Sequence, residues 1–141
     1  MTRNQKTNGY TKEIIGKIKN LGADLVGVAD TEPLKQLRLD PPDLLDSFQR
    51  ALSIAASLPK AVFEQISDRP TPLYASVYHS ANRVLDEIAF HAANLLQRDG
   101  FNSLPIPASQ VLDEENWYGA ITHKAVGRIA GLGGKAKACF W

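Results

Sequence analysis

The chain has 141 residues, of which 44% are hydrophobic and 22% charged, and this composition is that of a folded domain rather than of a disordered or fibrous protein. Sixteen lysines and arginines stand against fifteen acidic residues, and a net charge of +1 without a block of like charge argues against a nucleic-acid-binding protein. A single cysteine, Cys139, excludes an internal disulfide and a four-cysteine iron–sulfur cluster within these residues, so the sequence predicts a cytoplasmic protein.

The beginning of the chain is polar, and residues 1–10 are expected to form a disordered N-terminus without the apolar stretch of a secretory signal. Thr11 is the expected N-cap of a short amphipathic helix that ends at Gly22. The longest mainly apolar run, 51–58, is far shorter than the ~20 residues of a membrane-spanning helix, so no contact with a membrane is expected.

Two strands are expected next. Residues 23–29 form an apolar run typical of a buried strand, and 31–42 form a connection interrupted by prolines, followed by a short helix at 43–48. In 50–58, large apolar residues alternate with alanines and serines. A period of two with small residues on the second face predicts a strand that is covered on both sides.

The clearest pattern is a long amphipathic helix in the second half of the chain. Its apolar residues recur at spacings of four and three: Tyr74, Tyr78, Ala81, Leu85, Ile88, Ala92 and Leu95. Because alanines make this apolar stripe narrow, we expect the helix to pack on a sheet rather than in a coiled coil. The helix is expected to end near Gly100. Residues 101–107 predict a further short strand, and residues 120–129 predict another helix after the long one.

This order of elements predicts one layered α/β or α+β domain over 11–134, with a small sheet, mixed or parallel, packed by helices. Residues 135–141 alternate little and are expected to be an atypical tail outside the domain. Two interpretations are open for the glycine cluster that begins at Gly127: a phosphate-binding loop or a helix stop. The helix stop is favoured because the glycines follow a helix instead of opening one.

Three further features bear on chemistry. His79 and His91 point to different sides of the long helix, so no metal site is expected. His123 lies shortly before the glycine turn and is either a site residue or a solvated residue of the helix. Acidic residues at 113–115 come just before Trp117 and Tyr118. These carboxylates suit either a general acid with a raised pKa or a solvated loop.

Several segments, taken in order, resemble the epoxyqueuosine reductase family and its relatives, the corrinoid-dependent iron–sulfur reductases and reductive dehalogenases. The segments are the block between residues 24 and 58 (ADLVGVAD and FQRALSIAASLP), Tyr74-x3-Tyr78-His79 with the long helix, GFNSLPIPAS at 100–109 and HKAVGRIAGLG at 123–133. Together they span roughly residues 12–133.

The resemblance implies a cobalamin-binding reductase domain with a fold related to flavin nitroreductase-like modules, and a flavin is the alternative cofactor. In complete members, a ferredoxin-like domain with two four-iron clusters follows and delivers electrons to cobalt. The residues that the resemblance places at the cofactor pocket are Ser109, His123, Lys124, Gly131, Leu132 and Gly133.

The chain also departs from the family pattern. The family's proton-donating aspartate falls near Trp117, so the adjacent Glu115 and Asn116 are the catalytic candidates, and the cluster cysteines are absent. We therefore expect a truncated cofactor-binding-type domain without reductase activity of its own. It would either take electrons from a separate iron–sulfur protein or be a non-catalytic fragment that associates with itself. Since the family's later strands are missing, an exposed sheet edge is expected to make it a homodimer.

Overall fold

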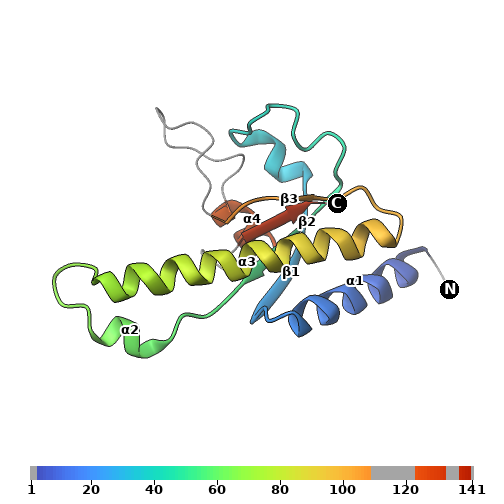
Figure 1. Ribbon diagram of the computed structural model, residues 1–141. Helices are drawn as coiled ribbons and strands as arrows, with labels where there is room; N and C mark the ends of the chain where they lie inside the picture. The colour runs from blue at the N-terminus through green and yellow to red at the C-terminus, as the bar shows by residue number, and fades with distance from the viewer. Residues whose placement is uncertain (1–2, 109–122, 133–136, 141) are drawn as a thin grey trace.

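The computed structural model describes residues 3–108, 123–132 and 137–140, and these form a mixed α/β structure in which helices pack on an antiparallel sheet (Figure 1). Along the chain, the described elements are α1 (Arg3–Asn20), β1 (Leu25–Asp30), the 3-10 helix η1 (Glu32–Gln36), β2 (Arg50–Ala55), α2 (Lys60–Glu64), α3 (Pro72–Arg98), β3 (Leu104–Pro105), α4 (His123–Ile129) and β4 (Lys137–Phe140).

The sheet has the strand order β1-β2-β4-β3. Its best developed pair is β1 with β2, which are antiparallel from Leu25 opposite Ala55 to Asp30 opposite Arg50. The pairs of β4 with β2 and with β3 are antiparallel too. The expected mixed or parallel sheet is therefore wrong for every strand pairing among the described residues.

The position of β4 explains why no parallel pair is found among these strands. Strands β2 and β3 both run antiparallel to β4, so they run parallel to one another and are joined by the crossover that contains α2 and α3. They are nevertheless not neighbours, because β4 lies between them. The expected atypical tail thus includes an interior strand of the sheet at residues 137–140.

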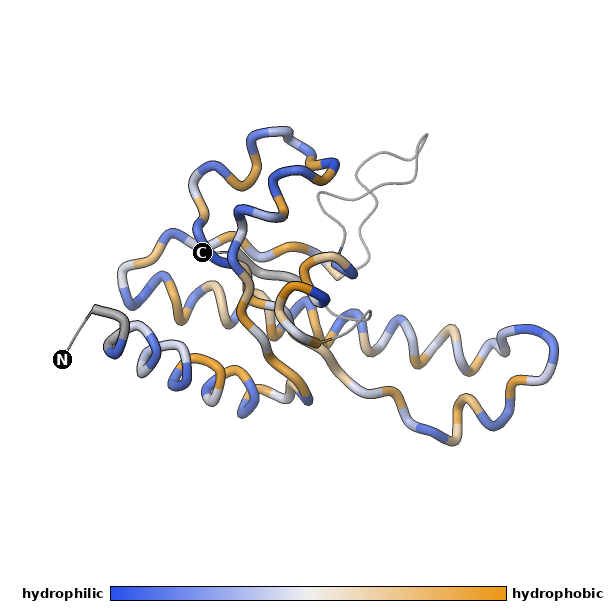
Figure 2. Tube along the Cα trace, turned by 180° about the vertical axis from the view of Figure 1, so that it is seen from behind, coloured by the Kyte–Doolittle hydropathy of each residue, from blue (hydrophilic) through white to orange (hydrophobic). Residues whose placement is uncertain are grey.

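The apolar parts of the chain gather where the strands are crossed by helices (Figure 2). In that view from behind, hydrophobic stretches meet near α4 and the strands, whereas the connection between α2 and α3 at the periphery is largely hydrophilic. Helices α1 and α3 cover one face of the sheet and α4 covers the other, as the alternation in 50–58 predicts.

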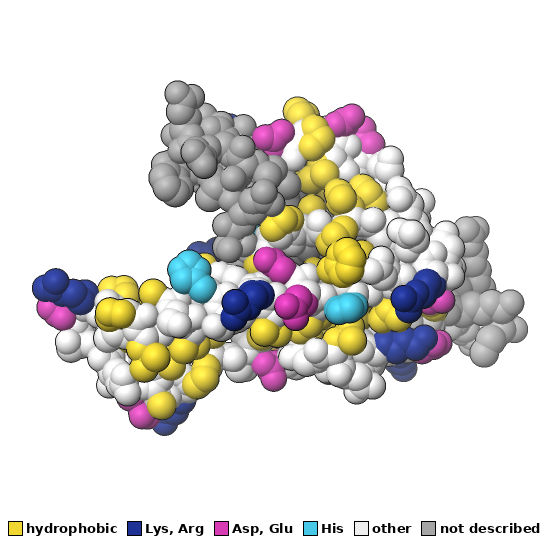
Figure 3. All heavy atoms as spheres, in the orientation of Figure 1, with side chains coloured by type: hydrophobic (Ala, Val, Ile, Leu, Met, Phe, Trp, Pro, Cys, Tyr) yellow, Lys and Arg dark blue, Asp and Glu magenta, His cyan; other side chains and the backbone are white. Residues whose placement is uncertain are grey.

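Helix α3 confirms the predicted long helix, but its two halves have different surroundings. Leu85, Ile88 and Ala92 are buried, whereas Tyr78 is 40% exposed, because the first half of the helix runs beyond the sheet beside α2 (Figure 1). We call α2 together with residues 72–84 the arm. Hydrophobic side chains gather on the arm's surface (Figure 3). Near the far end of the helix, Gly100 has a φ of +94°, which agrees with the predicted stop.

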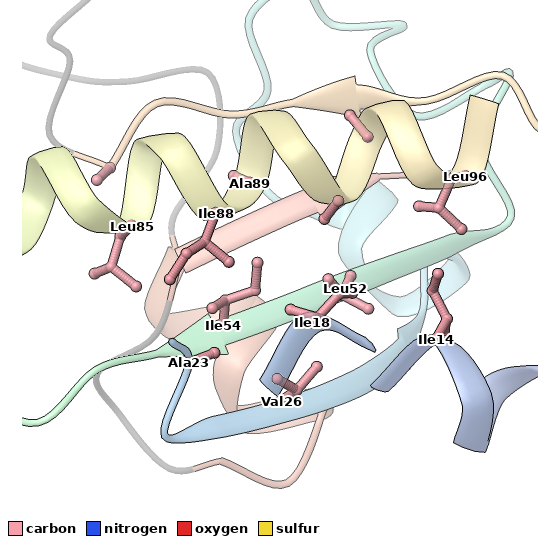
Figure 4. Packing of buried hydrophobic residues seen from close by; sticks show 13 residues of the cluster. Ile14, Ile18, Ala23, Val26, Leu52, Ile54, Leu85, Ile88, Ala89 and Leu96 are labelled. Carbon is pink, nitrogen blue, oxygen red and sulfur yellow. The ribbon is translucent and has the colours of Figure 1, made fainter. Parts of the chain in front are cut away.

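The first face of the sheet is covered by α1 and α3 (Figure 4). Val26 of β1 lies opposite Ile54 of β2, and these residues pack with Ile14 and Ile18 of α1 and with Ile88 of α3. All of these side chains are at most 9% exposed, and burying each one fully stabilises the fold by about 1.5–3 kcal/mol. Large apolar side chains therefore fill the space between the two helices and the sheet.

The second face consists of small residues. Gly27 lies opposite Ser53, and Ala29 lies opposite Ala51. The cover comes from α4 and from the segment 31–49, whose buried leucines Leu34, Leu39 and Leu45 belong to the same apolar cluster.

Three local expectations differ from the structure. Helix α1 begins at Arg3, so it takes in most of the expected disordered N-terminus, and the Thr11 hydroxyl donates to the carbonyl oxygen of Thr7 within the helix instead of capping it. Residues 43–48 form turns rather than a helix, and the short helical element of this segment is η1. The conformation of this segment depends on the burial of its leucines in the apolar cluster of the second face. Local sequence preference does not indicate that packing.

Candidate cofactor-binding site

The candidate site is built around the point where the chain leaves β3. The backbone N–H of Ala108 donates to the Asp86 carboxylate on α3, with 2.6 Å between N and Oδ1. Ala108 is 3% exposed and packs in the apolar cluster of the first face. A charged acceptor forms a stronger hydrogen bond than a neutral one, so Asp86 fixes the segment just after β3 to the long helix.

His123, the first residue of α4, lies at the same point. Its Nε2 is 2.9 Å from the carbonyl oxygen of Pro107. Because a carbonyl oxygen can only accept, the hydrogen bond requires the tautomer or charge state in which Nε2 carries a proton. This hydrogen bond therefore connects two segments that were expected at the pocket: the one that leads through Pro107 toward Ser109, and the one that begins at His123.

A buried amide lies on the same side of α3. Asn82 precedes Asp86 by four residues, which places the two side chains on one face of the helix. Asn82 is 6% exposed, and its Nδ2 has no hydrogen-bond partner among the residues that the structure describes. Leaving such a group unpaired costs about 1–3 kcal/mol, a cost that a bound polar group could offset.

Sequence reasoning missed Asp86 and Asn82. Both residues lie beside the apolar stripe of the helix, where polar residues usually face solvent. The only signal was the four-residue spacing of an amide and a carboxylate. Nothing in the sequence indicated that the carboxylate would meet the end of a strand more than twenty residues further on.

The glycine turn after α4 is a helix stop, as the favoured interpretation has it. The N–H of Leu132 donates to the Gly127 carbonyl at 2.8 Å, and that of Gly131 donates to the Arg128 carbonyl at 3.1 Å. With Gly131 at a φ of +81°, this is a Schellman motif. Its backbone N–H groups satisfy the helix's own carbonyls, so these two are not directed toward a phosphate.

The turn also packs directly against the sheet. A Cβ added to Gly27 of β1 would lie 2.6 Å from the carbonyl oxygen of Ala130 and 3.1 Å from Cδ2 of Leu132. Only a glycine in the strand permits this approach, because real Cβ atoms do not come so close to other heavy atoms. Leu132 thus has a packing role on the second face.

The expected pocket residues consequently divide into two groups. His123 and Leu132 make internal contacts. Lys124 is exposed, and a Cβ on Gly131 would meet no atom of the described residues within 4 Å. The remaining candidates lie outside the described residues: Ser109, Gly133, Glu115 and Asn116.

A second polar contact fastens α1 to the end of α3, away from this site. The Tyr10 hydroxyl donates to the Asp99 carboxylate at 2.9 Å, and the Tyr10 ring centre lies 5.2 Å from that of Phe101. Burial, followed by the hydrogen bond and negative charge of Asp99, raises the pKa of the Tyr10 phenol well above its ordinary value. The neutral phenol is the form that the folded protein favours.

Two searches of the described part of the chain bear on function. Within residues 3–108, 123–132 and 137–140, no three histidine, cysteine or acidic side chains group closely enough to hold a metal ion. None of the helices described there combines the length and apolarity needed to cross a membrane. Among known proteins, no family model, curated protein or solved structure matches this chain.

Proposed function

We propose that this chain is a cofactor-binding-type domain of a corrinoid-dependent reductase, with a nitroreductase-like arrangement of helices on a sheet. The observation that supports the proposal is the hydrogen bond between His123 Nε2 and the Pro107 carbonyl. It brings together residues 100–108 and 123–132, the described parts of two segments on which the resemblance to that family rests. Two motifs that are separate in the sequence thereby become neighbouring parts of one site.

The residues at this site fit a corrinoid on one side. Among the described residues, no atom lies within 4 Å of a Cβ added to Gly131, which suits the approach of a large, nearly flat ring. The exposed Lys124 ammonium can donate to the carbonyl oxygens of the amide groups that edge such a ring. His123 positions the start of α4 through its bond to Pro107 and acts as a support rather than as a ligand.

When bound, the corrinoid would supply a cobalt centre for reduction of a small molecule. Electrons would have to come from an iron–sulfur cluster outside these 141 residues, because Cys139 is the only cysteine among them and a cluster needs four thiolates. On this proposal the domain binds the cofactor but does not turn over a substrate by itself.

The direct test is a titration of the purified chain with hydroxocobalamin, under oxidising and reducing conditions, followed by visible spectrum and thermal unfolding. At about 100 times its dissociation constant, a ligand that binds only the folded state adds about 2.7 kcal/mol of stability. We expect a saturable spectral change and a higher melting temperature. A folded protein that gives neither change contradicts the proposal, and a response to flavin mononucleotide alone would replace the corrinoid by a flavin.

A matched pair of variants locates the site. Lys124→Ala should weaken hydroxocobalamin binding about tenfold, since hydrogen bonds from charged donors contribute about 1.5–3 kcal/mol. Lys12→Ala changes another exposed lysine, in α1 on the first face of the sheet, and should leave the affinity unchanged. Equal effects of the two substitutions would place the ligand elsewhere.

A non-catalytic, self-associating domain is the second candidate function. It is favoured by the large apolar side chains exposed on the arm: Phe63, Leu73, Tyr78 and Val84. A folded protein that responds to neither cofactor, but whose association depends on concentration, would support this candidate over the first.

A further inference from the structure

Helix α3 carries a second apolar stripe that the sheet does not cover. Leu73, Val77, Ser80 and Val84 follow one another at spacings of four, three and four. Each precedes by one residue a position of the apolar stripe that begins at Tyr74, so the second stripe is turned by about 100° around the helix. Leu73 is 50% and Val84 is 44% exposed, while Val77 and Ser80 are half-buried.

The second stripe is apolar only along the arm. Beyond Val84 the same spacing continues with Glu87 and His91, which are both exposed. In space-filling view, hydrophobic side chains gather over the projecting arm (Figure 3). Contiguous apolar patches of this kind on a surface mark interaction sites more often than isolated exposed residues do.

We infer that this stripe is a self-association surface, on which the first half of α3 packs antiparallel to the same segment of a second copy. A two-fold axis near Tyr78 places Leu73 opposite Val84 of the second copy, and Val77 opposite its Ser80. The spacing of four, three and four is the one by which helices interlock side by side. The spacings of four, three and four are the same in both directions along the helix. The stripe is therefore self-complementary about that axis, as a two-fold interface requires.

Charge complementarity favours a second copy as the occupant. In this register Glu87 lies opposite residue 70 of the second copy, at the N-terminal end of its α3 and next to its Arg69. The first turn of α3 contains no acidic residue. The Arg69 side chain is 85% exposed and lies 3.8 Å from the Asp68 carboxylate, in a pair so exposed that it contributes little. A carboxylate is stabilised both by a helix N-terminus and by an arginine, so the polar ends of the stripe match each other.

Association should be measured on the whole chain by light scattering and sedimentation over a wide concentration range. A contact confined to one stretch of helix should be weak, with a dissociation constant on the order of micromolar. We expect Val84→Glu and Leu73→Glu each to raise that constant at least about tenfold. Since both residues are exposed, circular dichroism should show the fold of these variants unchanged.

The matched control is Phe90→Glu. Phe90 lies on the same helix and is more exposed, at 57%, but it points about 120° away from Val84. The Phe90→Glu substitution should leave association unaffected. A protein that stays monomeric at every concentration overturns the proposal, and so does an equal response of the Phe90 and Val84 variants.

Charge reversal and cross-linking test the register. Glu87→Arg and Arg69→Glu should each weaken the dimer, and the double variant should restore it. In a Cys139→Ala background, a mixture of Leu73→Cys and Val84→Cys chains should form a disulfide between copies. Either variant alone should not, because its two copies of the cysteine would be about 16 Å apart along the helix. Cross-linking of a single variant with itself, or no rescue by the charge pair, rejects this register.

This surface is separate from the proposed cofactor site. Val84→Glu should therefore bind hydroxocobalamin as the unmodified chain does, so either proposal can fail without the other.

Discussion

The two faces of the sheet are packed in opposite ways. On the first face, α1 and α3 are held off the strands by large side chains such as Leu52 and Ile54, which are fully buried. On the second face, Gly27 allows the turn after α4 to come within direct contact of the strand backbone. One face is thus stabilised by the volume of its side chains, and the other depends on their absence. Substitutions that change volume should therefore act with opposite sign on the two faces.

Removal of volume from the first face should have the largest effect. Leu52→Ala leaves a cavity beneath α3, and we expect the free energy of unfolding to fall by about 2–5 kcal/mol in chemical denaturation. Leu25→Ala removes the same atoms from a half-exposed leucine of β1 and should cost less than about 1 kcal/mol. Similar losses for the two variants would mean that this face is not the main core.

Addition of volume to the second face should have the next largest effect. In Gly27→Ala the new Cβ meets the Ala130 carbonyl at 2.6 Å, so the turn after α4 must move, at a cost of about 1–3 kcal/mol. Gly16→Ala adds the same methyl group to an open position of helix α1 and should stabilise the protein by about 0.5–1 kcal/mol. The two substitutions can be compared in one series of denaturation curves. A stabilising Gly27→Ala would show that α4 does not press on the strand.

The second face also contains a polar group whose removal should help. The Ser53 hydroxyl is fully buried and has no hydrogen-bond partner in the described part of the chain, so Ser53→Ala should raise the free energy of unfolding by up to about 1 kcal/mol. Ser57→Ala, at an exposed position shortly after β2, is the control and should change little. A clear loss of stability in Ser53→Ala would indicate that the hydroxyl has a partner in solution.

The smallest effect is expected at the edge of the first face, where Tyr10 holds α1 to the end of α3. Since its pKa is raised on folding, its contribution to stability is complete below the ordinary phenol pKa of about 10 and is lost as the pH rises through the raised value. In an absorbance titration, Tyr10→Phe should remove a phenol that ionises above the ordinary range. Tyr78→Phe, at an exposed ring, is the control substitution.

Much of the fold could be predicted from the sequence because its signals are local. The period of two in 50–58 indicated both the strand and its two-sided cover, and the spacing of four and three from Tyr74 to Leu95 indicated α3 and its buried side. The glycines after α4 indicated the helix stop. At the site, the sequence singled out the neighbourhoods of Ser109 and His123, but it did not find Asp86 or Asn82.

Only the tertiary structure decided where β4 lies and what meets at the end of β3. A strand of four residues, Lys137–Phe140, has too little alternation to be recognised, and its position between β2 and β3 depends on hydrogen bonds to residues far away in the chain. The contacts of Ala108 with Asp86 and of Pro107 with His123 are likewise made between distant segments. Side-chain periodicity determines which face of an element is buried, whereas the pairing of distant backbone groups depends on the whole chain closing around its core.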